Sequence, residues 1–239
     1  MPTKRPILAN NEIYHVVLRG IDGRKIFEQE TDYYRMIHDI FEFNDIKPAG
    51  WRHRRFNVRE TVPRIKSEDR PRTIKYKRTF IVNILAFCWM PNHIHLLLKQ
   101  VKENGITNFM RKLGTGYAVY FNQKYERQGH LFQGRFKAVH IKTNEQLQSV
   151  FVYIHTNPVA LVAEKWKEGG IDDTDRIIEC IENYKWSSYQ DYLGKENFPS
   201  VTQRELFNQT MSKEKWREYV NDWVRHKSER VSDKSVELE

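Results

Sequence analysis

Two histidines, His93 and His95, are separated by one residue within an otherwise hydrophobic run from Phe80 to Leu98. On a β-strand, successive side chains point to opposite faces, so both imidazoles lie on one face and Ile94 on the other. Two imidazoles on adjacent same-face positions can hold one divalent metal ion between them. The alternative is that both are hydrogen-bonded core residues, which is the commoner role of a buried histidine. The triplet therefore predicts a candidate metal site and leaves its role open.

A second group of chemically capable residues lies in the stretch from Tyr153 to Asn157. These two residues are four apart, so on a helix they lie on the same face. A tyrosine that attacks a phosphodiester needs a metal ion beside the scissile phosphate, and the amide oxygen of Asn157 could serve as its third ligand. Attack would leave the DNA 5′-phosphate on Tyr153 and release a 3′-hydroxyl. Two neutral imidazoles and one amide add no charge, so a bound Mg²⁺ or Mn²⁺ would stay strongly electrophilic.

Both residues also have structural interpretations. Tyr153 is one of 12 tyrosines, and a buried tyrosine is usually a packing residue. Asn157 precedes Pro158, and Asn-Pro is a good helix start, so Asn157 could cap a helix from Pro158 to Lys165. The two interpretations differ in geometry. Tyr153 must lie across from the face that carries the two histidines, and packing of its helix on the Ile94 face would contradict the site.

The surrounding pattern predicts the elements that must position these residues. Runs of β-branched and apolar residues predict strands, and apolar residues at helical spacing predict helices. The predicted strands are 12–19, 80–87, 93–99 and a strand at the end of 129–141, and the predicted helices are 31–43 with Thr31 as its cap, 106–125 with Gly114 and Gly116 weakening its middle, and 144–156 starting at Asn144. This order predicts an α+β fold with a ferredoxin-like arrangement, in which helices flank a central, mainly antiparallel sheet.

The strands 80–87 and 93–99 are apolar on both faces and are joined by a tight connection, 90–92. This predicts central positions in a sheet that is covered on both sides by helices. We expect one catalytic domain over 1–163, with a basic insertion at 45–79, and a helical C-terminal extension over 164–239. The extension is expected to contain short helices and to end in a frayed polar tail from Lys227 onward.

Composition and charge narrow the partners. The net charge of +9 is concentrated in the middle of the chain, where residues 47–78 carry 12 basic and 3 acidic groups. A clustered basic field suits a polyanion such as nucleic acid, although a charged loop can also be only solvated. The sequence contains no run of 18 apolar residues, so no membrane span is predicted, and its first residues lack the apolar core of a signal peptide, so export is not expected. The two cysteines lack the spacing of a metal site. We expect a cytoplasmic protein with no membrane partner.

Basic residues next to aromatic residues or glycines are the candidate DNA contacts. In the segment 45–79, cations could meet phosphates while aromatic rings stack on bases, and a solvated loop is an equal alternative. Residues 129–137 are a candidate for backbone contact near the site, with a bulged strand as the alternative. The predicted contact residues are Arg19, Arg24, Arg52, Arg54, Arg55, Lys75, Lys77, Arg78, His130, Arg135 and Lys137.

Five motifs together resemble one family. In chain order they are Gly20 followed by 24–27 (RKIF), 90–97 (MPNHIHLL), 129–137 (GHLFQGRFK), 153–159 (YIHTNPV) and 186–189 (WSSY). This set resembles the REP-associated tyrosine transposases of the single-tyrosine HUH endonuclease superfamily, over about residues 12–193. The resemblance implies a ferredoxin-like or RRM-like core, His93 and His95 as the metal-binding pair, Tyr153 as nucleophile and Asn157 as third ligand. It also implies hairpin-bearing single-stranded DNA as the substrate.

The chain departs from the family pattern at several points. Ile21-Asp22 follows the first-strand glycine where the family usually has Asn, Ala160-Leu161-Val162 replaces a frequent Arg-Ala-Gly, and the basic segment 45–79 is an elaboration. The target sequence and the hairpin contacts therefore stay open, as does the choice between monomer and homodimer. Two other functions are compatible with the residues: a non-catalytic, domesticated hairpin-binding protein, and a metallohydrolase that uses activated water.

Overall fold

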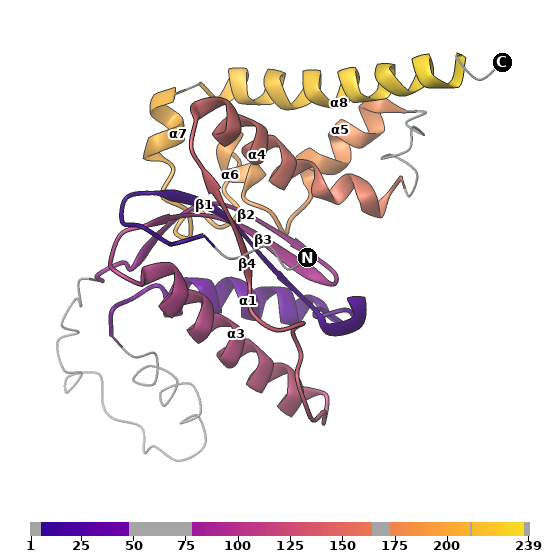
Figure 1. The fold of residues 1–239 in the computed structure, drawn as a ribbon. Helices are drawn as coiled ribbons and strands as arrows, with labels where there is room; N and C mark the ends of the chain where they lie inside the picture. Colours follow the sequence, from indigo (N-terminus) through magenta and orange to yellow (C-terminus); the bar gives the residue numbers. More distant parts are fainter. Residues whose placement is uncertain (1–5, 48–77, 164–172, 211, 237–239) are drawn as a thin grey trace, which may run out of the picture.

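The computed structural model describes residues 6–47, 78–163, 173–210 and 212–236 (Figure 1). The strands are β1 (Ile13–Arg19), β2 (Val82–Met90), β3 (His93–Gln100) and β4 (Lys137–Ile141). The helices are η1 (Ile21–Gly23), α1 (Glu30–Phe43), α3 (Gly105–Lys124), α4 (Asn144–Thr156), η4 (Asn157–Leu161), α5 (Thr174–Asn183), α6 (Tyr189–Tyr192), α7 (Glu205–Thr210) and α8 (Lys213–Val236). The order and types of elements confirm the predicted α+β fold.

The four strands form one antiparallel sheet in the order β2-β3-β1-β4. Helices α1 and α3 cover one face, and α4 with the C-terminal helices covers the other (Figure 1). Residues of β1 alternate between the two layers, so Tyr14, Val16 and Leu18 pack under α1 and α3. The sheet therefore separates two hydrophobic cores, one on each face.

Strand β2 lies at the end of the sheet order, although it is buried on both faces. The prediction of a central position for β2 was therefore wrong. Its outer edge is covered by a later part of the chain: the amide of Trp89 donates to the carbonyl of Trp186 at 2.8 Å, and the amide of Ser188 donates to the carbonyl of Phe87 at 3.0 Å. Gln203 exchanges hydrogen bonds with Ile84 farther along. This cover satisfies the backbone groups that an edge strand leaves unpaired.

The N-caps of α1 and α4 are not the residues that the sequence singled out, although α4 itself begins at the predicted Asn144. Helix α1 begins with a capping box, in which the carboxylate of Asp32 accepts from the amide of Gln29 at 3.0 Å, so Gln29 is the N-cap and the predicted Thr31 is not. Helix α4 is capped by Thr143, whose hydroxyl accepts from the amide of Gln146 at 3.2 Å, one residue before the predicted start at Asn144. In both cases the cap is the residue whose side chain reaches the free amides of the first turn.

The C-terminal extension differs most from the prediction. The predicted short helices are present as α5, α6 and α7, but the tail predicted to be frayed from Lys227 is part of a 24-residue helix, α8, that continues to Val236. The extension shares one hydrophobic core with the sheet and α4, since buried Tyr189, Phe207 and Trp216 pack in the same cluster as Leu97 and Phe151. The predicted domain boundary at 163/164 adjoins residues 164–172, which lie outside the described residues. Among the helices that the structure describes, none is long and apolar enough to cross a membrane.

Candidate active site

The sheet face under α4 carries a row of polar side chains. His93 and His95 project from β3 onto this face, with ring centroids 4.8 Å apart. Directly opposite residues of paired antiparallel strands share a face. Arg19 pairs with His93, Val17 pairs with His95, and Lys137 of β4 pairs with Val17. Two cations predicted to contact DNA, Arg19 and Lys137, are thereby placed on the same face as the histidines.

The hydrogen bonds of Asn92 define the protonation of His93. The amide nitrogen of Asn92 donates to the carbonyl of Gly23 at 3.2 Å, which directs its Oδ1 toward the Nδ1 of His93 at 2.6 Å. An amide oxygen can only accept, so Nδ1 of His93 carries the proton. The lone pair of a neutral His93 is then on Nε2, which is the form that a metal ligand needs.

His95 is 1% exposed and has a partner that the sequence did not single out. The Nε2 of His15, on β1, lies 2.9 Å from the Nδ1 of His95, and the two rings stack with centroids 5.1 Å apart. Burial lowers the pKa of His15 to about 4, so this ring is neutral at pH 7. Because His15 occupies Nδ1 of His95, it is Nε2 of His95 that faces a potential metal ion.

Tyr153 lies on the predicted side of the sheet. Its ring meets His95 edge-on with centroids 5.5 Å apart and meets His15 at 5.7 Å. The rest of α4 explains this orientation: Leu147, Phe151 and Ile154 are buried in the core, whereas Tyr153 is turned to the side and is 38% exposed. The geometric condition on the site is confirmed, since the Tyr153 ring contacts the histidine face and Ile94 belongs to the opposite core.

Asn157 closes the end of the same helix. Its Nδ2 donates to the carbonyl of Tyr153 at 2.6 Å, which satisfies a carbonyl of the last turn of α4. The 3-10 helix η4 begins at Asn157 itself and its N-cap is Thr156, so Asn157 does not cap a helix that starts at Pro158. With Nδ2 directed at the backbone, Oδ1 is the atom of Asn157 that remains to bind a cation.

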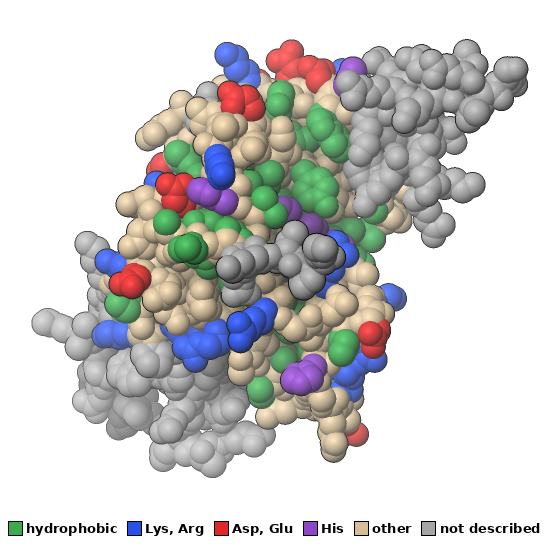
Figure 2. Space-filling model, in the orientation of Figure 1, with side chains coloured by type: hydrophobic (Ala, Val, Ile, Leu, Met, Phe, Trp, Pro, Cys, Tyr) green, Lys and Arg blue, Asp and Glu red, His purple; other side chains and the backbone are tan. Residues whose placement is uncertain are grey.

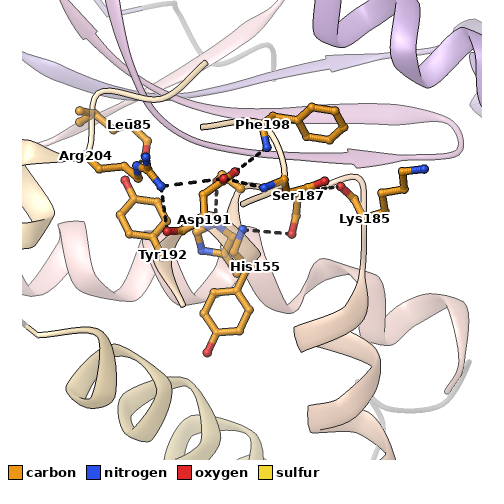
Figure 3. Close-up of polar contacts among 11 residues, drawn as sticks. Leu85, His155, Lys185, Ser187, Asp191, Tyr192, Phe198 and Arg204 are labelled. Atoms are coloured by element: carbon orange, nitrogen blue, oxygen red, sulfur yellow. Dashed lines mark hydrogen bonds and ion pairs between the residues drawn. The ribbon is translucent and has the colours of Figure 1, made fainter. Parts of the chain in front are cut away.

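A buried polar network holds α4 against the cover of β2. The Nε2 of His155 lies 2.8 Å from the hydroxyl of Ser188, which also accepts from the amide of Phe87. Burial lowers the pKa of His155 to about 3, so it is neutral here. Figure 3 shows the neighbouring carboxylate of Asp191, which accepts from the amide of Phe198 and faces Arg204. Because His155 lies two residues after Tyr153, this network holds in place the helix that carries the tyrosine.

A metal ion held by His93, His95 and Asn157 would meet only neutral donors. These would be the Nε2 atoms of the two histidines and the Oδ1 of Asn157. Within the part of the chain that the structure describes, no group of three or more His, Cys, Asp and Glu side chains is arranged to hold a metal ion. A bound ion would therefore keep most of its charge and would need oxygens of water or phosphate to complete its coordination.

The other residues predicted to contact DNA differ in their exposure and in their partners. His130 and Arg135 are exposed on the segment before β4, and Arg24 is exposed after η1. Arg78 is engaged elsewhere: its guanidinium donates to the carbonyl of Phe41 at 2.7 Å and pairs with Glu42 at 3.0 Å. The remaining predictions, Arg52, Arg54, Arg55, Lys75 and Lys77, lie outside the described residues. Figure 2 shows several basic side chains across the middle of one face, with histidines visible beside them.

The family comparison agrees with this geometry. A model of the family described as "Transposase IS200 like" matches residues 52–157, a range that includes the histidine pair, Tyr153 and Asn157. Over this range, 106 of the 239 residues, the chain is similar to the IS200-like transposases. This similarity confirms the resemblance to transposases that the five motifs indicate.

Two further comparisons concern curated proteins and solved structures. No curated protein matches this chain. One similar solved structure is described as the structure of the REP-associated tyrosine transposase bound to a REP hairpin, at 15% sequence identity and a TM-score of 0.49, covering 85% of this chain and 94% of that chain.

His15 is the site residue that sequence reasoning missed. Its only sequence signal is its position, two residues before Val17 in a strand of alternating burial, which places it on the same face as Val17 and Arg19. The pairing of β1 with β3 brings that face next to the histidine pair, and this register is not evident from the local pattern.

Proposed function

We propose that this protein is a transposase, a metal-dependent endonuclease and strand transferase of single-stranded DNA. Tyr153 is its nucleophile, and His93, His95 and Asn157 hold Mg²⁺ or Mn²⁺. The observation that carries the proposal is the contact of the Tyr153 ring with His95, with Asn157 one turn farther along the same helix. A hairpin-bearing substrate is inferred from the motif resemblance, and the similar solved structure is described as bound to a REP hairpin.

In the proposed reaction, Tyr153 breaks the phosphodiester bond and the metal-binding residues assist it. A bound divalent ion would polarise the oxygens of the scissile phosphate and offset the charge that develops there. The Oη of Tyr153 attacks phosphorus and gives up its proton, the bond from phosphorus to the 3′-oxygen breaks, and the leaving oxygen takes up a proton. The products are a 5′-phosphotyrosine and a free 3′-hydroxyl. Reversal of the same step with another 3′-hydroxyl joins the strands, because the ester keeps the energy of the broken bond.

The positions of the side chains are compatible with attack by Tyr153 on a bound DNA strand. Tyr153 is partly exposed, so a DNA strand can reach its hydroxyl, whereas His95 is buried behind it and is held by His15. Arg19 and Lys137 are exposed residues on the same sheet face as the histidines, where they can contact the phosphates on either side of the cut. The neutral His15 adds no competing charge to the site.

The test is a covalent-adduct assay with a labelled hairpin that carries single-stranded flanks. With Mg²⁺ or Mn²⁺, the wild-type protein should form an adduct that survives denaturation, and Tyr153→Phe should form none. Tyr219→Phe is the matched control, because Tyr219 is exposed to a similar extent on α8. Equal adduct from both variants would refute the nucleophile assignment. Cleavage without adduct that survives Tyr153→Phe would instead indicate activated water, and hairpin binding without nicking would indicate a binding protein.

A further inference from the structure

A cleft of about 740 Å³ lies on the other side of the sheet from Tyr153, between α3 and the segment 129–136. Its floor is apolar and includes Leu18, Met110 and Phe132, and its walls include small residues of α3 such as Gly114 and Ala118. This volume falls in the range of about 300–1,000 Å³ that is usual for small-ligand sites. The cleft is therefore large enough for part of a nucleic acid strand.

The two glycines of α3 differ in their surroundings. A Cβ added to Gly116 would lie 2.6 Å from the ring of Phe43, so close packing of α1 and α3 explains this glycine. A Cβ added to Gly114 would have only Leu18 within 4 Å, at 3.9 Å. Glycine is among the least favourable residues inside a helix, and packing does not require it at 114. The absent side chain instead leaves the wall of the cleft open.

The residues that line the cleft indicate which class of ligand it could bind. Arg111 on α3 and Arg135 on the opposite wall are exposed at its rim, together with His130, and no acidic residue lines it. An apolar floor with guanidinium groups at the rim matches a nucleotide that is not base-paired, whose base is flat and apolar on its faces and whose phosphate is anionic. A fully paired duplex could not offer a base to such a floor.

The cleft is linked directly to the histidine face. The amide of Gln133 donates to the carbonyl of Arg19 at 2.9 Å, and Arg19 pairs with His93 across the sheet. Beyond Phe136, the same segment enters β4 at Lys137 on the histidine face. One short segment, 131–137, thus contacts both the cleft and the face where the cut is proposed.

We propose that this cleft binds an unpaired nucleotide of the DNA substrate, with the base on the apolar floor and its phosphates at Arg111 and Arg135. The proposal rests on the proposed function, because it assigns a binding site to the same single-stranded substrate. The nucleotide comes from the flank of a hairpin or from its loop, and both sources present the same chemistry. Occupancy of the cleft positions the strand that continues to Tyr153.

The experiment fills the cleft and measures DNA affinity by fluorescence anisotropy. All proteins carry Tyr153→Phe, so that binding is measured without cleavage. Gly114→Leu places a side chain in the cleft and should weaken binding of a hairpin with single-stranded flanks about tenfold or more, because stacking of a base is lost. Ala118→Leu, one turn farther along α3, should have the same effect. Gln123→Leu is the control, since it adds the same side chain to an exposed position of α3 outside the cleft.

Three probes identify the source of the nucleotide: the flanked hairpin, the hairpin without flanks, and the flanking oligonucleotide alone. A loss of affinity that appears only with flanks indicates a flanking nucleotide, and an equal loss on the blunt hairpin indicates the loop. Affinities within twofold of the parent on every probe, for both cleft-filling variants, would overturn the proposal. Thermal melting checks the fold, and Gly114→Leu should melt no lower than its parent, since it replaces a helical glycine.

The rim cations provide a second, independent readout. Arg135→Gln should reduce the slope of log affinity against log salt concentration by about 0.7, the value for one phosphate contact to a single strand. An unchanged slope would contradict phosphate contact at this rim. Failure of the proposed function is distinguishable, because it appears as the absence of a covalent adduct with wild-type Tyr153, whatever the affinities of the cleft variants.

Discussion

At the scale of single residues, Asn92 has a role that can be tested apart from catalysis. Its Oδ1 accepts from Nδ1 of His93, so Nε2 is the nitrogen that would bind the proposed metal ion. Loss of such an outer hydrogen bond typically weakens metal binding by about 10- to 100-fold. We expect Asn92→Leu to show this loss when Mn²⁺ binding is followed by electron paramagnetic resonance without DNA. Asn92→Asp keeps an accepting oxygen and should lie closer to wild type; equal affinities for all three proteins would contradict the role.

Several of the residues in the site were predictable because their chemistry is encoded locally. The spacing of His93 and His95 on a strand and of Tyr153 and Asn157 on a helix defines which faces they share, and their proximity followed once the motifs were taken together. His15 and Asn92 were not predictable in the same way. Their roles depend on the register of β1 against β3 and on one contact to Gly23, and neither is expressed in the residues nearby.

At the scale of elements, one buried carboxylate contributes to the contact between α1 and α3. Asp32 accepts from the ammonium of Lys124 at 2.6 Å and from the hydroxyls of Tyr120 and Tyr125. Burial raises the pKa of Asp32, but hydrogen bonds from Lys124, Tyr125 and the amides of 28 and 29 outweigh it and leave the pKa below its ordinary value. The ionised carboxylate therefore both caps α1 and ties it to α3.

Replacement of Asp32 by asparagine should lower the free energy of unfolding by about 2–3 kcal/mol at pH 7, because a charge-assisted network is lost. The folded-state pKa is depressed, so the stabilisation is present above the unfolded-state pKa of about 4 and is lost as the pH falls through the folded-state value. Urea unfolding should show a wild-type advantage at pH 7 that narrows below pH 4. Glu218→Gln, an exposed change on α8, is the control, and a constant difference across this pH range would contradict the assignment.

Element types were more predictable than element ends and neighbours. The periodic patterns identified all four strands and the α-helices α1, α3 and α4 among the described residues up to 163, whereas the 3-10 helix η1 had been predicted as a turn. The caps of α1 and α4, Gln29 and Thr143, were not the residues that the sequence singled out. The length of α8 was underestimated, although no glycine or proline interrupts 213–236. The apolar faces of β2 indicated burial correctly, but its edge position depends on residues 186–188, about 100 positions later in the chain.

At the scale of the whole molecule, the C-terminal extension and the catalytic half share one core. Phe151 of α4 contacts Tyr192, Phe207 and Trp216, with ring centroids between 4.3 and 4.8 Å apart. Phe151 precedes Tyr153 by two residues, so the extension supports the helix that carries the proposed nucleophile. The extension also supplies the backbone partners of the outer edge of β2. Both contacts imply that the two halves unfold together.

This coupling predicts the behaviour of Trp216→Ala. The side chain is almost fully buried, so its removal should lower the free energy of unfolding by about 3–5 kcal/mol. If the halves are one cooperative unit, unfolding in urea stays a single transition that moves to lower concentration, with coincident curves from far-ultraviolet circular dichroism and tryptophan fluorescence. Trp223→Ala, a partly buried tryptophan on the same helix, should cost less. Two separated transitions, with the sheet unaffected by Trp216→Ala, would show instead that the extension folds alone, and then it could not position Tyr153.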